Sequence, residues 1–226
     1  MRGSVGRAKA LRVTRIGVFA ALYAATSLVP ISVFIGAPSF LTLNLVVTPV
    51  LAFLLSPIEA FLASLFGAIA ALYVAPLQAM FGLFTILLPV AGSTFGSLAS
   101  HGKKLGAVAT ALYLLAAISA YLVKNYPFPY FVAPHSLAIV ATLASLFRKD
   151  VSFGLRVPMY AFVSTMCEQG MMMIFAVHLL GLPWQVFPGI LPLMIYERIV
   201  GTVGGAVVIF ALMKAIPKYF TETKIH

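Results

Sequence analysis

Residues 157–214 read VPMYAFVSTMCEQGMMMIFAVHLLGLPWQVFPGILPLMIYERIVGTVGGAVVIFALMK. Two long apolar runs, 157–180 and 190–213, are joined here by a turn over Gly181–Trp184. Each run is long enough to cross the hydrocarbon core of a bilayer as a helix, which takes about 20 residues. The same pattern recurs along the chain. The expected fold is therefore an all-α integral membrane protein, a polytopic helical bundle.

Three charged residues interrupt these apolar runs: Glu168, Glu197 and Arg198. A charge at the centre of a bilayer costs about 2.5–3.5 kcal/mol on insertion scales, so such residues face a protein interior or a wet cavity. Two interpretations stay open. The charges form a polar functional site inside the bundle, or they form a structural Glu–Arg pair that locks two helices together.

Composition points to the same class of protein. The chain has 226 residues, 62% of them hydrophobic and 9% charged, whereas soluble domains average about 25% charged residues. We expect one transmembrane domain over 1–226 and no separate soluble domain. The net charge of +10 comes from basic residues beside apolar runs, which indicate helix orientation rather than nucleic-acid binding.

The apolar runs predict about eight spans and no strands, because they have the length of helices rather than the 9–11 residues of barrel strands. We also expect a kink at Pro89, inside the fourth run. The predicted spans are 16–36, 43–55, 57–75, 78–99, 105–123, 132–147, 157–180 and 190–213.

The basic residues predict the orientation of these spans. If the chain starts in the cytoplasm, all 15 Lys and Arg residues except Lys124 and Arg198 fall on the cytoplasmic side, as the positive-inside bias requires. We therefore expect a multi-pass protein of the plasma membrane with both termini cytoplasmic and the loop 124–131 outside.

Small residues mark possible helix contacts. Residues four apart with small side chains let another helix approach closely, and the first span carries such a pattern at Ala20, Ala21, Ala24 and Ala25. Without a partner, the same pattern is simply a good helix former. Glu59, at the start of the third span, is interpreted as a structural residue in the first turn of a helix.

Sequence motifs of enzymes are absent. The chain has no GxxxxGK[ST] phosphate loop, no HExxH and no GxSxG, and those patterns carry the chemistry of ATP hydrolysis, zinc proteolysis and serine hydrolysis. Cys167 is the single cysteine, and the consecutive Met171–Met173 point in three directions around a helix. We expect no enzymatic activity, no cofactor and no metal site.

Three stretches carry a resemblance to a known family. These are the first helix, RIGVFAALYAA at 15–25, the pair NLVVTPVLAFLLSP at 44–57 with the helix that follows it, and PLMIYERIVG at 192–201. In this order, they resemble the S components of energy-coupling factor (ECF) vitamin transporters. The S-component core has six helices, so the resemblance assigns the core to about 13–100 and 157–214. The run 105–147 is then an inserted hairpin.

The resemblance implies a function. S components capture a small vitamin or cofactor precursor from outside, then dock their first helix on a transmembrane subunit that carries two cytoplasmic ATPases. The docking residues would be Ala20, Ala21, Ala24 and Ala25. Ligands in the family lie in the outer half of the bundle, between the later helices and under the loop after the first helix. Here those positions hold Asn44, Glu168, Gln169, Trp184, Tyr196, Glu197 and Arg198.

Several alternatives stay open on the sequence alone. Arg198 is the favoured ligand contact because its planar donors suit carboxylate and carbonyl groups, and Trp184 is equally well interpreted as an interface anchor. A stand-alone proton-coupled secondary transporter, with Glu168 as the proton carrier, is the second candidate function. A membrane scaffold without a substrate is the third.

Overall fold

The computed structural model describes residues 2–34, 39–101, 104–147 and 152–216. These ranges contain eight α-helices, four short 3-10 turns and one pair of strands, which confirms the expected all-α membrane bundle. The helices are α1 (Arg2–Thr26), α2 (Asn44–Leu54), α3 (Pro57–Val74), α4 (Leu87–Ser100), α5 (Lys104–Asn125), α6 (Ala133–Phe147), α7 (Phe153–His178) and α8 (Phe187–Ala215).

Six of the helical segments in the described ranges are long and apolar enough to cross a membrane, so this is a multi-pass membrane protein. They contain α3, α4, α5, α6, α7 and α8. The predicted span 43–55 forms α2, which has only 11 residues. At 1.5 Å per residue α2 is about 16 Å long, and a helix of that length does not cross a bilayer.

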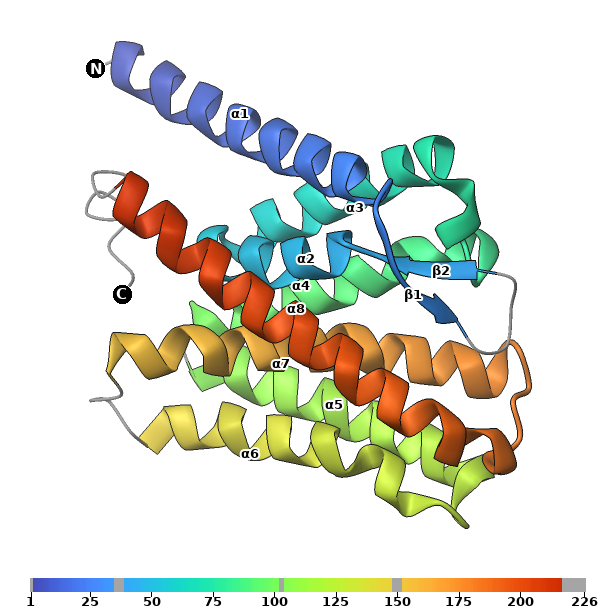
Figure 1. The fold of residues 1–226 in the computed structure, drawn as a ribbon. Coiled ribbons are helices and arrows are strands. Elements are labelled where there is room, and N and C mark those ends of the chain that lie inside the picture. Colours follow the sequence, from blue (N-terminus) through green and yellow to red (C-terminus); the bar gives the residue numbers. More distant parts are fainter. Residues whose placement is uncertain (1, 35–38, 102–103, 148–151, 217–226) are drawn as a thin grey trace.

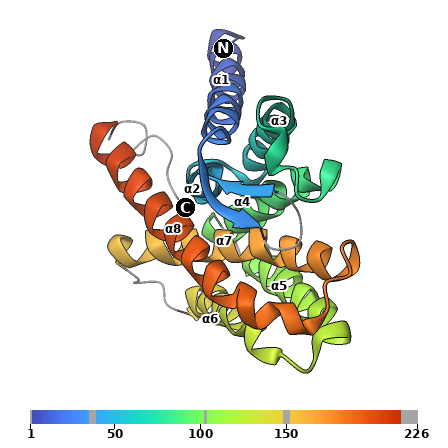
Figure 2. The ribbon, with the colours of Figure 1, turned by 45° about the vertical axis from the view of Figure 1, so that its right-hand side comes forward.

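The elements alternate in direction (Figure 1). The beginning of α1 and the end of α8 lie at one end of the bundle, together with the end of α6 and the beginning of α7. The two strands, the connection from α5 to α6 and the connection from α7 to α8 lie at the other end. Figure 2 shows α1 and α3 on one side and α5 and α6 on the opposite side, with α2, α4 and α7 between them.

The expectation that the chain has no strands was wrong. The first helix ends at Thr26 rather than near residue 36, and β1 (Pro30–Phe34) pairs antiparallel with β2 (Ser39–Thr42). Pro30 cannot donate a backbone hydrogen bond to a helix, and the alternation that follows it, Ile31-Ser32-Val33, suits a strand. The apolar run therefore changes from helix to hairpin inside the predicted span.

The fourth predicted span also begins differently. Residues 78–86 form no single helix: 3-10 turns at Pro76–Gln78 and Gly82–Ile86 precede α4. Pro89 is the third residue of α4, where the first N–H groups of a helix have no intrahelical partner. Pro89 thus lies in the first turn of α4 rather than in its interior, and the kink there stays a prediction.

The short helix α2 forms the centre of the bundle, and all of its residues are buried. It packs against α4, α7 and α8. Hydroxyl groups of α4 hold it in place: Ser97 Oγ donates to Leu55 O at 2.6 Å and Ser100 Oγ to Ala52 O at 2.9 Å. These bonds hold the last turn of α2 against α4.

Helices α5 and α6 form the hairpin expected at 105–147. They pack against each other and against α7, where Tyr113 Oη donates to Cys167 O at 2.8 Å. An apolar cluster at this contact includes Tyr121, Phe131 and Phe187. The α5–α6 hairpin therefore covers the face of α7 that lies away from α2 and the two strands (Figure 2).

Candidate binding site

A small polar cavity lies directly beneath the β1–β2 hairpin. Its volume is about 20 Å³, and its walls come from α1, β2, α2, the turns that follow α3, α4 and α7. Aromatic and aliphatic side chains, including Phe40, Leu41 and Met80, form part of the wall. The polar side chains that line it are Tyr23, Thr42, Asn44, Gln78, Thr85 and Glu168.

A buried hydrogen-bond network joins the segments around this cavity. Asn44 Nδ2 donates to Ser27 Oγ at 2.9 Å and to Gln78 Oε1 at 2.8 Å. Thr42 Oγ1 donates to the same Gln78 oxygen at 3.1 Å. The end of α1, the strand β2, the start of α2 and the turn after α3 are therefore tied to one another around the polar wall.

Glu168 is the charged residue of the cavity wall. It comes from α7, is 5% exposed, and its Oε2 has no hydrogen-bond partner among the described residues. Gly92 of α4 makes room for it: a Cβ at position 92 would lie 2.9 Å from Glu168 Cβ and 2.7 Å from Thr48 Cγ2. Only glycine lets α4 approach α2 and α7 this closely.

Glu197 and Arg198 are buried residues of α8 that do not line the polar cavity. Arg198 is 3% exposed; its Nη1 donates to Thr165 O at 3.1 Å, and its Nη2 lies 3.7 Å from Glu197 Oε2. Its Nε and Nη2 make no hydrogen bond in the described part of the chain. The charge of Arg198 interacts with those of Glu197 and Glu168, so the three residues form one buried charged cluster.

Glu197 also connects α8 to the hairpin. Ser32 Oγ, on β1, donates to Glu197 Oε1 at 2.8 Å. The hydrogen bond joins residues 165 positions apart in the chain. The two strands are therefore anchored at two places, since β2 forms part of the cavity wall and β1 is held by α8.

The residues predicted as ligand contacts fall into three groups. Asn44 and Glu168 line the polar cavity. Gln169, Glu197 and Arg198 are buried in the same part of the bundle, and Gln169 Oε1 makes no hydrogen bond within the described ranges. Trp184 and Tyr196 are 39% and 52% exposed and are not part of the cavity wall, which agrees with the anchor interpretation of Trp184.

Sequence reasoning missed four polar residues of the wall: Tyr23, Thr42, Thr85 and Gln78. A signal existed for Gln78, an amide in an otherwise apolar segment that follows Pro76. Tyr23 and Thr85 carried no such signal, because tyrosine and threonine are ordinary in membrane helices and their interfaces. Thr42 lies on a strand that the sequence did not predict.

The predicted docking face of α1 divides into two faces. Ala20 and Ala24 turn toward the bundle: a Cβ at Gly67 of α3 would lie 3.0 Å from Ala20 O, and Ala24 is buried. Ala21 and Ala25 are exposed, as is Gly17 one turn earlier. Successive helical residues are about 100° apart, so the two alanine pairs cannot face one partner.

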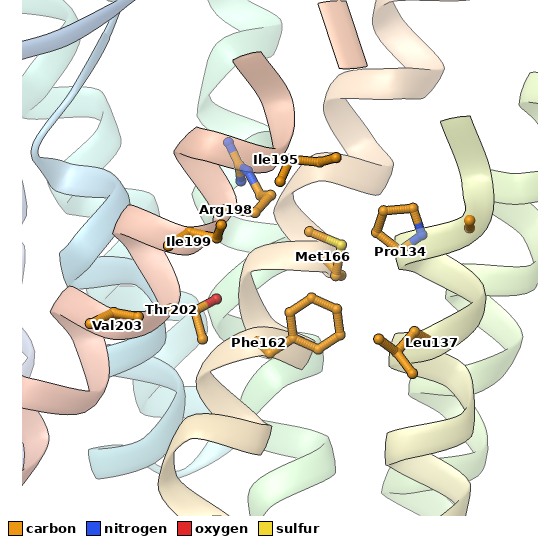
Figure 3. Close-up of a pocket in the computed structure, with 10 residues that line it drawn as sticks. Pro134, Leu137, Phe162, Met166, Ile195, Arg198, Ile199, Thr202 and Val203 are labelled. Atoms are coloured by element: carbon orange, nitrogen blue, oxygen red, sulfur yellow. The ribbon is translucent and has the colours of Figure 1, made fainter. Parts of the chain in front are cut away.

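A larger apolar groove lies outside the polar cavity, between α6, α7 and α8 (Figure 3). Its volume is about 430 Å³. Pro134 and Leu137 line one side and Ile199 and Val203 the other, with Phe162 between them. Arg198 and Thr202 also line the groove, but the surface that it offers is mainly apolar.

Within the ranges that the structure describes, no group of three or more His, Cys, Asp or Glu side chains is placed to hold a metal ion.

Comparison with known proteins gives no match to a family model, to a curated protein or to a solved structure.

Proposed function

We propose that this protein is the substrate-capture subunit of an ECF-type transporter, which binds a small vitamin-like molecule or cofactor precursor from outside the cell. The observation that carries the proposal is the polar cavity under the hairpin that follows α1. Its position agrees with the ligand position that the resemblance to S components implies. The partly unsatisfied polar wall is what a buried binding site for a small polar molecule requires.

Ligand entry requires the hairpin to move. The cavity of about 20 Å³ holds roughly one water molecule, which is far less than a vitamin occupies. The strands leave the bundle only if the hydrogen bond from Ser32 to Glu197 and those among Thr42, Asn44 and Gln78 open. These bonds then form again around, or with, the bound molecule.

Transport would need partners. The chain has no ATP-binding phosphate loop, so a separate transmembrane subunit with two ATPases supplies the energy in this proposal. The exposed face of Gly17, Ala21 and Ala25 on α1 is the docking surface, because small side chains permit close helix contact. The positive-inside bias of the sequence supports a plasma-membrane protein with both termini in the cytoplasm.

Two measurements test this function together. Native mass spectrometry of gently purified protein is expected to find a co-purified small molecule. Affinity purification of the tagged chain from its own membranes is expected to recover a transmembrane subunit and ATPases. The proposal fails if the chain retains no small molecule and also takes no ATPase with it.

A second candidate function rests on Glu168. A buried carboxylate without a hydrogen bond on Oε2 is suited to carry a proton, so the chain alone would be a secondary transporter. Reconstitution in liposomes separates the two functions. Substrate uptake by the pure chain, driven by a proton gradient and lost in Glu168→Gln, would support the secondary transporter and contradict the capture subunit.

A further inference from the structure

The charges around the polar cavity do not balance. Glu168 is the one charged side chain among the residues that line it, and it makes no ion pair in the described part of the chain. Its Oε2 lacks a hydrogen-bond partner although the residue is 95% buried, since only 5% of its surface is exposed. A buried carboxylate oxygen without a donor is costly, so Oε2 is the atom that a donor from a ligand would stabilise most.

Arg198 does not cancel this charge. Its guanidinium donates to Thr165 O at 3.1 Å and lies 3.7 Å from Glu197, and Arg198 is not among the residues that line the polar cavity. The cluster of Glu168, Glu197 and Arg198 thus contains one guanidinium and two carboxylates. When all three are ionised, it carries one negative charge in excess. An excess charge inside a membrane is costly, so it favours a compensating positive charge.

The neutral wall of the cavity complements a cation. Gln78 Oε1 already accepts hydrogen bonds from Thr42 and Asn44, so these three residues mainly fix the shape of the wall. The aromatic rings of Tyr23 and Phe40 line the same space as Glu168. Aromatic rings attract cations through their negative faces, and together with a carboxylate they form a recognised type of site for organic cations.

We infer that Glu168 selects a ligand with a positively charged nitrogen, an ammonium group or a protonated nitrogen heterocycle, which it binds through an ion pair at Oε2. This inference rests on the proposed function, since it names the class of molecule that the cavity under the hairpin captures. A cation at Oε2 removes the excess negative charge and supplies the missing donor. A neutral donor would supply the missing hydrogen bond but would leave the excess negative charge in place.

Three probes of the same ring and similar size test the inference: benzylamine, benzyl alcohol and benzoate, which are cationic, neutral and anionic near pH 7. Isothermal titration calorimetry on the full chain in detergent measures their affinities. We expect benzylamine to bind roughly tenfold or more tightly than benzyl alcohol, and benzoate to bind most weakly. Glu168→Gln is expected to remove most of the preference for benzylamine over benzyl alcohol.

Matched variants exclude a general effect of charge or folding. Glu59→Gln removes another buried carboxylate, one that caps α3 through Ser56 and does not line the cavity, so the preference for benzylamine should persist. Glu168→Asp keeps the charge and should keep part of the preference. The inference is overturned if benzoate binds best, if the preference survives Glu168→Gln, or if no probe binds.

The failure of this inference can be told apart from the failure of the proposed function. If the probes bind without regard to charge and Asn44→Ala weakens all of them, the cavity is a binding site but not one for cations. If no probe binds and no molecule co-purifies with the chain, the capture function fails as well.

Discussion

Gly92 shows how closely the residues around the cavity are packed. In Gly92→Ala, the added methyl group would lie 2.7 Å from Thr48 Cγ2 and 2.9 Å from Glu168 Cβ, inside van der Waals contact. Overpacking of this kind costs about 1–3 kcal/mol. We expect a lower thermal midpoint in detergent and weaker ligand binding, since Glu168 must move.

Gly154→Ala is the matched control for this prediction. Gly154 is also helical, but a Cβ there would have no atom within 4 Å. The thermal midpoint of Gly154→Ala should therefore be equal to that of the wild type or slightly higher. Equal effects of the two substitutions would mean that the packing of α4 against α2 and α7 is looser than the structure shows.

Arg198 is the residue for which the structure most changes the expectation from sequence. The sequence favoured it as a ligand contact; in the structure its guanidinium contacts Thr165 O and Glu197, and the residue lines the apolar groove rather than the polar cavity. Removing one partner from a buried ion pair costs about 3–5 kcal/mol. We therefore expect Arg198→Gln to destabilise the protein without ligand, measured as the loss of folded protein on heating in detergent.

The double variant Glu197→Gln with Arg198→Gln distinguishes the two roles of Arg198. Loss of both charges should restore part of the stability, because no charge of the pair is then left unpaired. Normal stability of Arg198→Gln with a large loss of ligand affinity would instead restore the interpretation of Arg198 as a ligand contact.

Among the elements, α1 allows the sharpest test of docking. Ala21 and Ala24 differ by three positions but face opposite surroundings, since Ala21 is exposed and Ala24 is buried. Ala21→Leu should block close approach of a partner helix, so less ATPase co-purifies, while ligand binding persists. Ala24→Leu should instead lower the thermal midpoint. If Ala21→Leu abolishes ligand binding and spares assembly, the docking surface is wrongly assigned.

The elements also show what could be predicted from sequence and why the rest could not. Helices such as 105–123 were predicted well, because a long apolar run in a membrane can satisfy its backbone hydrogen bonds only as a helix. The hairpin was missed because the run 16–36 is apolar throughout, and composition does not distinguish helix from paired strands once Pro30 ends the helix.

The candidate site was predicted only in part for the same reason. Charges in apolar runs identified Glu168, Glu197 and Arg198 as a buried cluster, because burying a charge is expensive anywhere in a membrane. Which of them borders a cavity depends on how α4, α7 and the hairpin meet. That contact depends on Gly92 and on the strand register, which one sequence does not specify.

For the whole molecule, the alternation of elements predicts which loops face outward. The connection from α5 to α6 lies at the same end of the bundle as the β1–β2 hairpin (Figure 1). It contains Tyr126, which is 74% exposed. Tyr126→Cys should react with a membrane-impermeant maleimide added to intact cells. Cys167 is buried and serves as the unreactive background. If position 126 were labelled only after the membrane is opened, this loop would face the cytoplasm and the predicted orientation would be wrong.

The central claim is that a small molecule binds in the cavity under the hairpin. The most direct test is the affinity of the co-purified molecule for wild type, Asn44→Ala and Trp184→Phe, measured by equilibrium binding in detergent. Asn44 holds the wall through Ser27 and Gln78, and loss of such buried hydrogen bonds costs about 1–3 kcal/mol. We predict a roughly tenfold loss for Asn44→Ala and no loss for Trp184→Phe. Unchanged affinity in Asn44→Ala, with a large loss in Trp184→Phe, would contradict this account.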